Sequence, residues 1–462
     1  MKAPWFVALL FPALSAAAAG PRVDFAAPAV TVACHDYVEV TIRLAEAQRL
    51  ETPGVISVSG VFTREGEASA IVDGFRDAAD GSTHRVRFAP SHPGTYSYSV
   101  TYRSGDHVAT HEGHFEASGV AGKGMLRADP EFPAHFQWDG SKERFFWNGL
   151  TAGIIATCDD SAMVGRLEIL DRARITGIRV ALTDDSIDAW RNLERLVTQA
   201  RDRDIIVAIA LAHAADDDLG LARHAIARFA AFRNVIWDVD DPCVSPNDCS
   251  QADALRALLA ERDPYGHPTH SPRPIASSGA ASSCTMAGAE VPGPVDHLRT
   301  AWETCLAGGY PTLDACFANA CNSGDAGFGD LAMALEPFAH LYDFFTGFTW
   351  WELQADPEIV VSLQPHPSAR QPGRPAPRAF AARNADGDLA AVYIADGGVV
   401  SLDSERLRDQ LKPLWFSPRD GGMRNARALR DRVYRTPTAE DWVLLFRTPC
   451  NCSFRDFDGE RE

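Results

Sequence analysis

Residues 232–242 read F-R-N-V-I-W-D-V-D-D-P, and the rest of the chain is interpreted around this stretch. The apolar run at 235–237 predicts a buried strand. Three carboxylates follow: Asp238, Asp240 and Asp241. Acidic residues at the carboxyl end of an apolar strand are typical of the catalytic edge of an α/β barrel. An Asp before a Pro, as at Pro242, also opens ordinary turns, so both interpretations stand.

Strands and helices alternate around this stretch. Apolar strands are predicted at 178–182 and 205–211, with amphipathic helices on either side of them. Continuous apolar strands that alternate with helices indicate a parallel sheet covered on both faces. We therefore expect a (β/α)8-like barrel over residues 130–360. The stretch between His270 and Arg273 is too short for a complete strand and helix, so one barrel unit is expected to be missing or reduced.

Two later segments of this region are also interpreted. The glycine-rich stretch at 322–329 lacks the lysine and the spacing of a phosphate-binding loop, so it predicts a surface loop. Residues 348–352, F-T-W-W-E, predict a strand that carries an aromatic pair and a carboxylate.

Polar and aromatic residues near the predicted strand ends supply the candidate site. We expect Asp241 or Asp240 to act as acid or base, and Glu290, in a long predicted loop, is the candidate nucleophile. The candidate substrate-binding residues are Asn148, Asp184, Asp185, His213, His270, Tyr310, Trp350, Trp351 and Glu352. No metal and no cofactor is expected.

Each of these candidates also has a structural interpretation. Asp184 and Asp185 precede a predicted helix, and Asp is a favoured helix N-cap. The two histidines fit hydrogen-bonded edge residues as well as a catalytic role. The aromatic residues could stack on sugar rings, but aromatic pairs belong more often to a core.

Regions rich in strands flank the predicted barrel. Apolar and polar residues alternate at 38–44 and again at 96–102, and Pro and Gly turns separate the runs, which predicts a β-sandwich over 22–120. Its scattered histidines are interpreted as surface residues. Five prolines in residues 365–377 predict a linker, and a small β domain is expected over 378–452. The fold class is therefore multidomain.

The first twenty residues predict a secretory signal. They have a charged start, an apolar run from Trp5 to Leu14 and small residues before a cleavage site near Ala19. We expect an exported chain without a membrane span. Its net charge of −18 does not suit nucleic acid as a partner, because phosphates would be repelled.

Ten cysteines in an exported chain predict disulfides rather than a zinc site. Cys243 with Cys249 and Cys316 with Cys321 are close enough in sequence to close small loops. The remaining pairing is left open.

The order of several motifs resembles a bacterial glycoside-hydrolase-like family. Its members join an N-terminal immunoglobulin-like domain of unknown function, an apiosidase-like barrel and a C-terminal β domain described as collagen-binding. The matching segments are F-A-P-S-H-P-G-T at 88–95, F-F-W-N-G-L-T-A at 145–152, G-I-R-V at 177–180, residues 234–238 and 263–270, W-E-T-C-L-A-G-G-Y at 302–310, residues 350–351, 415–421 and 441–442.

The resemblance implies an exported hydrolase that cleaves the glycosidic bonds of a polysaccharide or oligosaccharide with two carboxylates. The chain departs from the family at two positions. Pro242 stands where the family has an acid after the fourth strand, and residues 273–279 lack the later acid, with Glu290 the nearest carboxylate. The alternative is a catalytically degenerate scaffold that binds carbohydrate or a surface partner without cleaving it.

Overall fold

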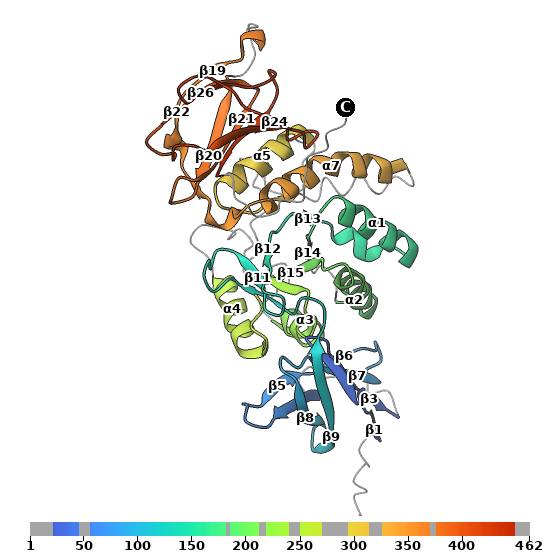
Figure 1. Ribbon diagram of the computed structural model, residues 1–462. Helices are drawn as coiled ribbons and strands as arrows, with labels where there is room; N and C mark the ends of the chain where they lie inside the picture. Colours follow the sequence, from blue (N-terminus) through green and yellow to red (C-terminus); the bar gives the residue numbers. More distant parts are fainter. Residues whose placement is uncertain are drawn as a thin grey trace, which may run out of the picture.

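The computed structural model describes residues 22–45, 56–181, 185–211, 219–239, 250–269, 294–313, 326–369 and 376–448. These residues form a multidomain, strand-rich molecule in which a central α/β region lies between two β regions (Figure 1). None of the helices among them is long and apolar enough to cross a membrane.

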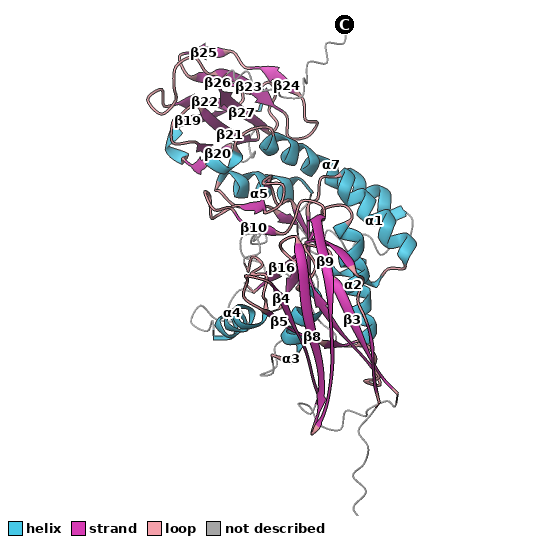
Figure 2. Cartoon of the chain, turned by 60° about the horizontal axis from the view of Figure 1, so that its bottom comes forward, coloured by secondary structure: helices cyan, strands magenta, loops and turns pink. Residues whose placement is uncertain are grey.

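The N-terminal region is built from two sheets. One has the order β1 (Val23–Ala26), β3 (Val38–Leu44), β7 (Thr83–Phe88) and β6 (Phe75–Arg76). The other has the order β2 (Thr31–Cys34), β9 (His107–Val120), β8 (Gly94–Ser104), β4 (Ile56–Arg64) and β5 (Ala70–Asp73). Figure 2 shows the long strands β3, β8 and β9 running together. Every second residue of β3 is buried, as the alternation predicts.

One histidine of this region departs from the expected surface position. His84 of β7 is buried, and its ring lies 5.9 Å from the ring of Tyr102. Burial lowers the pKa of His84 to about 4, so the ring is neutral at pH 7. The strand alternation explains the position, because His84 pairs with Ile42 of β3, whose side chain also faces the core.

The central region contains a parallel sheet and the helices that cover it. A small antiparallel sheet precedes it, formed by β10 (Leu126–Ala128), β11 (Phe136–Trp138) and β12 (Arg144–Phe145). The parallel sheet has the order β16 (Val235–Asp238), β15 (Ile206–Ala210), β14 (Gly177–Ala181), β13 (Gly149–Thr151) and β17 (Thr312–Leu313). The helices are η1 (Gly153–Thr157), α1 (Asp160–Arg172), α2 (Ile187–Arg201), α3 (Gly220–Phe229), α4 (Ser250–Arg262), α5 (Pro294–Leu306) and α7 (Ala326–Thr346).

Local hydrogen bonds explain where two of these helices begin. Asp159 caps α1, since its carboxylate accepts a hydrogen bond from the N–H of Ala162 at 2.9 Å. Ser186 caps α2 in the same way, and its hydroxyl accepts from the N–H of Ala189 at 3.2 Å. The capping interpretation of Asp185 was therefore wrong by one residue.

Two elements of this region differ from the sequence prediction. The predicted strand at 348–352 is wrong, because Trp350–Glu352 forms the 3-10 helix η3. Its aromatic residues pack into a core and do not alternate across a sheet, so they only imitate a strand in composition. The predicted loop at 322–329 is too long, since α7 begins at Ala326.

The C-terminal region again contains two sheets. One has the order β18 (Gln354–Ala355), β20 (Arg378–Arg383), β21 (Leu389–Ala395), β27 (Trp442–Arg447), β23 (Lys412–Phe416) and β24 (Met423–Asn425). The other has the order β19 (Val360–Pro365), β22 (Gly398–Leu402), β26 (Val433–Arg435) and β25 (Ala428–Arg430). Short 3-10 helices, η4 (Pro357–Ile359) and η5 (Pro367–Ala369), flank β19.

The proline-rich stretch at 365–377 does not separate two folding units. Strand β18 comes before it and β19 ends at its first residue, Pro365, yet these strands pair with β20 and β22, which come after it. The stretch therefore connects strands within the C-terminal region. Proline disfavours strand pairing both in a loop within a domain and in a linker between domains. A high proline content therefore does not distinguish a loop from a linker.

Buried ion pairs join the N-terminal sheets to helices α2 and α3. Arg87 of β7 donates to Glu194 of α2 at 2.6 Å, and Arg228 of α3 donates to Asp77 at 2.9 Å and to Glu194 at 2.7 Å. The Arg87 and Arg228 side chains are 2% and 1% exposed. Buried charges must stay paired, so this network holds the two regions in one relative position.

A second buried network joins the C-terminal region to α5. Arg299 donates to both carboxylate oxygens of Asp441 at 2.8 Å, and the Tyr393 hydroxyl donates to Asp441 at 2.6 Å. Trp302 stacks on Tyr393 with ring centroids 5.7 Å apart. Figure 1 shows α5 and α7 between the C-terminal sheets and the central region.

The described cysteines do not support the disulfide prediction. Cys34 and Cys305 are buried and belong to no disulfide, and burial raises the pKa of the Cys305 thiol well above its usual value. The Cys158 sulfur accepts a hydrogen bond from Arg166. The predicted pairs of Cys243 with Cys249 and of Cys316 with Cys321 lie outside the described residues.

The interface histidine His224 makes the fold sensitive to acid. Its ring lies between Trp190 and Phe75, and burial, with nearby Arg228, lowers its pKa to about 3. In the unfolded state His224 binds a proton near pH 6.5, but in the folded state only near pH 3. The contribution of His224 to the free energy of unfolding is therefore complete above pH 6.5 and falls as the pH decreases toward about 3.

We expect His224→Phe to keep the packing and to remove this dependence. The melting temperature, measured from pH 7 to pH 4, should therefore fall less steeply in this variant than in the unmodified chain. The exposed His114→Phe is the control. Equal slopes in the His224→Phe variant and the unmodified chain would contradict the assignment.

Candidate functional site

One face of the parallel sheet carries polar side chains near its carboxyl edge. Thr151 and Arg179 are partners in register across β13 and β14, and Asp238 of β16 is the partner of Ala210. Residues in register on neighbouring strands share a face, so these three side chains lie on one side of the sheet. The opposite face carries apolar residues such as Ile178 and belongs to the core.

Arg179 and Asp238 form an ion pair across the intervening strand. The Arg179 Nε donates to the Asp238 carboxylate, and the two side chains are 13% and 2% exposed. Strand β15 lies between them, and its residues on this face, Ala208 and Ala210, are small enough for the arginine to pass. Asp238 therefore holds the end of β16 in place, two residues before Asp240.

Strand β16 is also anchored on its other side. The Trp237 indole N–H donates to Asp263 at 3.0 Å, and the backbone N–H of Trp237 donates to the carbonyl of Pro268. Burial alone would raise the pKa of Asp263, but His267 and the hydrogen bonds from the Trp237 indole and the Tyr265 N–H lower it to about 2. The segment that ends at Thr269 thus lies beside β16 and leads to His270.

Several predicted site residues lie outside the described residues. These are Asp240, Asp241, Glu290, Asp184, His213 and His270. Three of them follow adjacent strands: Asp184 comes after β14, His213 after β15 and Asp240 after β16. Parallel strands end at the same edge, so the chain enters all three segments from the edge that carries the Arg179–Asp238 pair.

Asn148 lies at the wrong edge for the role predicted from sequence. It precedes β13, at the amino edge of the sheet, and its side chain is fully buried. The Asn148 amide donates to the carbonyl of Arg174 at 3.0 Å and to that of Phe338 at 3.2 Å. The apolar residues before Asn148 are not a parallel strand, so Asn148 begins a strand instead of ending one.

Tyr310 and Trp350 come together, but in a core. The Tyr310 hydroxyl lies 2.7 Å from Nδ1 of His135, and Phe146 packs against both Tyr310 and Trp350. Burial raises the pKa of Tyr310 above its usual range. Tyr310 precedes β17 at the amino edge, so the core interpretation describes this pair better than a sugar platform does.

Three predicted residues are partly or fully exposed. The Arg144 guanidinium lies 4.3 Å above the ring of Trp351, and Glu352 accepts a hydrogen bond from Thr349 at 3.0 Å. Asp185 is exposed before α2, and its carbonyl accepts a hydrogen bond from the Trp190 indole at 3.1 Å.

Sequence reasoning missed Arg179. The signal was present, because a lone arginine inside the apolar strand G-I-R-V needs a buried partner, and Asp238 at the end of a later strand supplies one. Among the described side chains, no group of three or more His, Cys, Asp or Glu residues is placed to hold a metal ion.

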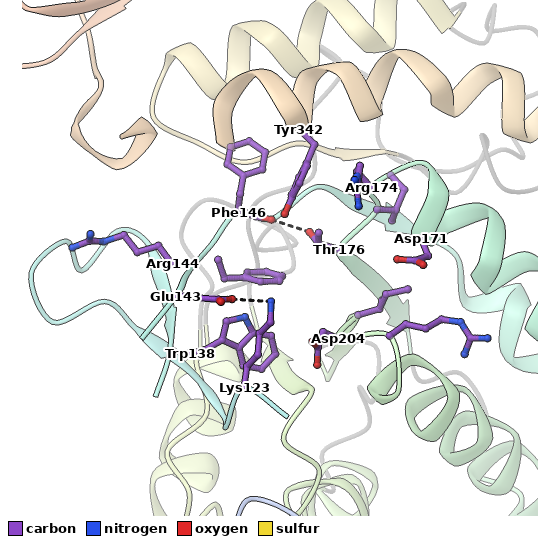
Figure 3. Close-up of a pocket in the computed structure, with 14 residues that line it drawn as sticks. Lys123, Trp138, Glu143, Arg144, Phe146, Asp171, Arg174, Thr176, Asp204 and Tyr342 are labelled. Carbon is purple, nitrogen blue, oxygen red and sulfur yellow. Dashed lines mark hydrogen bonds and ion pairs between the residues drawn. The ribbon is translucent and has the colours of Figure 1, made fainter. Parts of the chain in front are cut away.

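A pocket opens at the amino edge, opposite the Arg179–Asp238 pair (Figure 3). Its volume is about 250 Å³. Thr176 and Ile205, which precede β14 and β15, line it, as do Lys123 and Tyr342. Because the amino face of an α/β barrel serves stability in most enzymes, this pocket is not the expected place for catalysis.

Two family models match parts of the chain. Residues 32–103 match the "Domain of unknown function (DUF5060)", and residues 369–447 match the "Putative collagen-binding domain of a collagenase". These matches lie in the N-terminal and C-terminal β regions. No curated protein matches the sequence.

Solved structures share the fold of the chain at low sequence identity. A Bacteroides vulgatus protein described as a "putative glycoside hydrolase" is 15% identical, with a TM-score of 0.59, over 90% of this chain and 99% of that one. A glycoside hydrolase family 5 protein from Bacteroides vulgatus is 14% identical, with a TM-score of 0.54, over 71% and 93%. A further glycoside hydrolase is 13% identical, with a TM-score of 0.55, over 71% and 97%. The chain therefore has a glycoside-hydrolase-like fold.

We expect Asp238→Ala to destabilise the chain strongly. It leaves the Arg179 charge without its carboxylate inside the sheet, which costs about 3–5 kcal/mol of unfolding free energy. Urea unfolding followed by circular dichroism measures the change, and the exposed Asp185→Ala is the control. The double variant Arg179→Met, Asp238→Leu should recover much of the loss. If the double variant lost as much unfolding free energy as Arg179→Met alone and Asp238→Leu alone lose together, the pair would not be coupled.

Proposed function

We propose that the chain is a glycoside hydrolase that cleaves glycosidic bonds of a polysaccharide at the carboxyl edge of the parallel sheet. The observation that carries the proposal is the Arg179–Asp238 pair, which fixes the end of β16 on the polar face of the sheet. Asp240 and Asp241 follow within three residues. The likeness in fold to glycoside hydrolases supports the same function.

The proposed chemistry assigns one role to each of two carboxyl groups. Asp240 or Asp241 protonates the oxygen of the leaving sugar, and Glu290 attacks the sugar carbon or activates water. Asp238 takes neither role, because its carboxylate is committed to Arg179. The Arg179 guanidinium supplies a fixed positive charge beside the proposed site.

The proposal includes a reduced (β/α)8 barrel around this edge. Strand β17 pairs with β13 on the side away from β14, as the last strand of a closed barrel pairs with the first. The described residues between β16 and β17 contain two helices, α4 and α5, whereas an eight-unit barrel has four there. This difference supports a barrel with fewer units.

Export is also part of the proposal. The apolar run from Trp5 to Leu14 and the small residues after it support a cleaved secretory signal. A polysaccharide outside the cell would then be the substrate.

A binding protein on a retired hydrolase scaffold is the second candidate. Pro242 and the acid-free stretch at 273–279 favour it, because they stand where the resembling family has carboxylates. The match of residues 369–447 to a collagen-binding family also points to a binding role for the C-terminal region.

Hydrolysis of polysaccharides by paired variants separates the two candidates. In a screen of plant pectins and bacterial exopolysaccharides by reducing-sugar release, the unmodified chain should cleave at least one. The double variant Asp240→Asn, Asp241→Asn should lose activity by about 10²–10⁴-fold, because the proton donor is gone. Asp188→Asn, an exposed change in the first turn of α2, is the control.

Two results would reject hydrolysis through these carboxylates. One is a double variant that keeps full activity. The other is a chain that binds a polysaccharide equally well with and without the two aspartates and cleaves none, which would establish the binding role.

A further inference from the structure

Two neighbouring turns at the amino edge of the parallel sheet share an unusual feature. Helix α1 ends in a turn where the N–H of Arg174 donates to the carbonyl of Asp171 at 3.0 Å and that of Ile175 donates to Leu170 at 2.9 Å. This pair of hydrogen bonds requires a residue in the left-handed conformation just after the helix end, a position that glycine occupies most often. Here the residue is Arg174, with φ of 56°.

Helix α2 ends in the same way one strand further along the sheet. The N–H of Asp204 donates to the carbonyl of Arg201 at 3.1 Å, and that of Ile205 donates to Ala200 at 3.0 Å. Asp204 has φ of 53°. Two adjacent turns thus carry a charged residue where glycine would be least strained.

Both charged residues line the same pocket at the amino edge (Figure 3). Strands β14 and β15 follow the two turns and pair with each other, which brings Arg174 and Asp204 to neighbouring positions. Glycine at either position would remove a side chain from the pocket lining. Strain kept at two turns for the same pocket is typical of a binding site.

The two side chains keep hydrogen-bonding groups for a ligand. Arg174 meets Asp343 only at 3.7 Å, and Asp204 meets Arg233 only at 3.6 Å. These separations exceed those of a good hydrogen bond. A ligand in the pocket can therefore accept from the guanidinium and donate to the carboxylate.

The charges around the pocket balance. Three cations and three carboxylates line it in addition to Arg144: Lys123, Arg174, Arg203, Glu143, Asp171 and Asp204. Arg144 is occupied by Asp129 and Glu131, which accept its hydrogen bonds. The pocket consequently has no net charge that would select an anion or a cation.

The volume and the lining together define the ligand. The pocket, at about 250 Å³, is just below the range of about 300–1,000 Å³ for drug-sized ligands, so a single sugar ring or a small disaccharide suits it. The lining carboxylates can accept hydrogen bonds and the guanidinium groups can donate them, which matches the hydroxyl groups of a sugar. Tyr342 adds a partly exposed aromatic ring from α7.

We propose that this pocket is a binding site for a neutral mono- or disaccharide, separate from the carboxyl edge. Arg174 and Asp204 contact the sugar hydroxyls, and their left-handed conformation is retained for that purpose. The site does not depend on the proposed hydrolase function, since it lies at the opposite edge of the sheet.

Saturation-transfer NMR on the full chain tests the site. The probes are glucose, galactose, xylose and lactose, with glucuronate and inorganic phosphate as anionic comparisons. We expect at least one neutral sugar to bind, and Arg174→Gly and Asp204→Gly each to weaken that binding at least tenfold. Each variant should also melt at a higher temperature, because glycine relieves the strained turn. Gln410→Gly, at a left-handed position far from the pocket, is the control.

Four outcomes would overturn the proposal. No neutral sugar binds, or only glucuronate or phosphate binds. In the third outcome, a neutral sugar binds equally well to Arg174→Gly, Asp204→Gly and the unmodified chain. A lower melting temperature in both glycine variants would show that the side chains serve the fold instead of a ligand.

Discussion

The buried pair of Arg179 and Asp238 is the interaction on which the carboxyl edge depends. An arginine inside an apolar strand is costly unless a carboxylate neutralises it, and that carboxylate must lie within a few ångströms. Asp238 meets this requirement from two strands away, because the residues of β15 that lie between the two side chains on this face are the small alanines Ala208 and Ala210. The pair therefore fixes both the register of β14 to β16 and the point where the acidic segment leaves the sheet.

Buried charges also set how the three regions fit together. Arg87, Arg228 and Glu194 link the N-terminal sheets to α2 and α3, and Arg299 with Asp441 links the C-terminal sheets to α5. Separation of either interface would leave charges without partners in an apolar setting, so the β regions are fixed parts of the molecule. A substrate that contacts a β region would meet it in a constant position relative to the central sheet.

Most of the regular elements could be predicted from the sequence, because their periodicity is strong. The strands near 178 and 206 lie within a few residues of their predicted bounds, and a helix follows each of them as predicted. The sequence could not tell at which edge of the sheet Asn148 lies, since a polar residue beside an apolar run can mark either end of a strand. The strand predicted at Trp350 was wrong for a related reason. Aromatic residues are common in strands, but they also pack into cores from other elements, as Trp350 does from η3.

The candidate site was harder to predict than the fold. Arg179 and Asp238 are far apart in sequence, and their contact follows only from the parallel order of β14, β15 and β16. The turn residues Arg174 and Asp204 were also missed, since a left-handed conformation leaves no mark when the residue is not glycine. Pairing order and backbone conformation are tertiary properties that composition and periodicity do not report.

The most direct test of the central claim is a distance between carboxyl groups at the carboxyl edge. A crystal structure that places residues 240–249 and 270–293 would provide it. The account predicts that Asp240 or Asp241 lies roughly 5–10 Å from a second carboxylate across one cleft, the separation that glycosidic cleavage needs. A structure with no second carboxylate within about 10 Å of either aspartate would contradict the account.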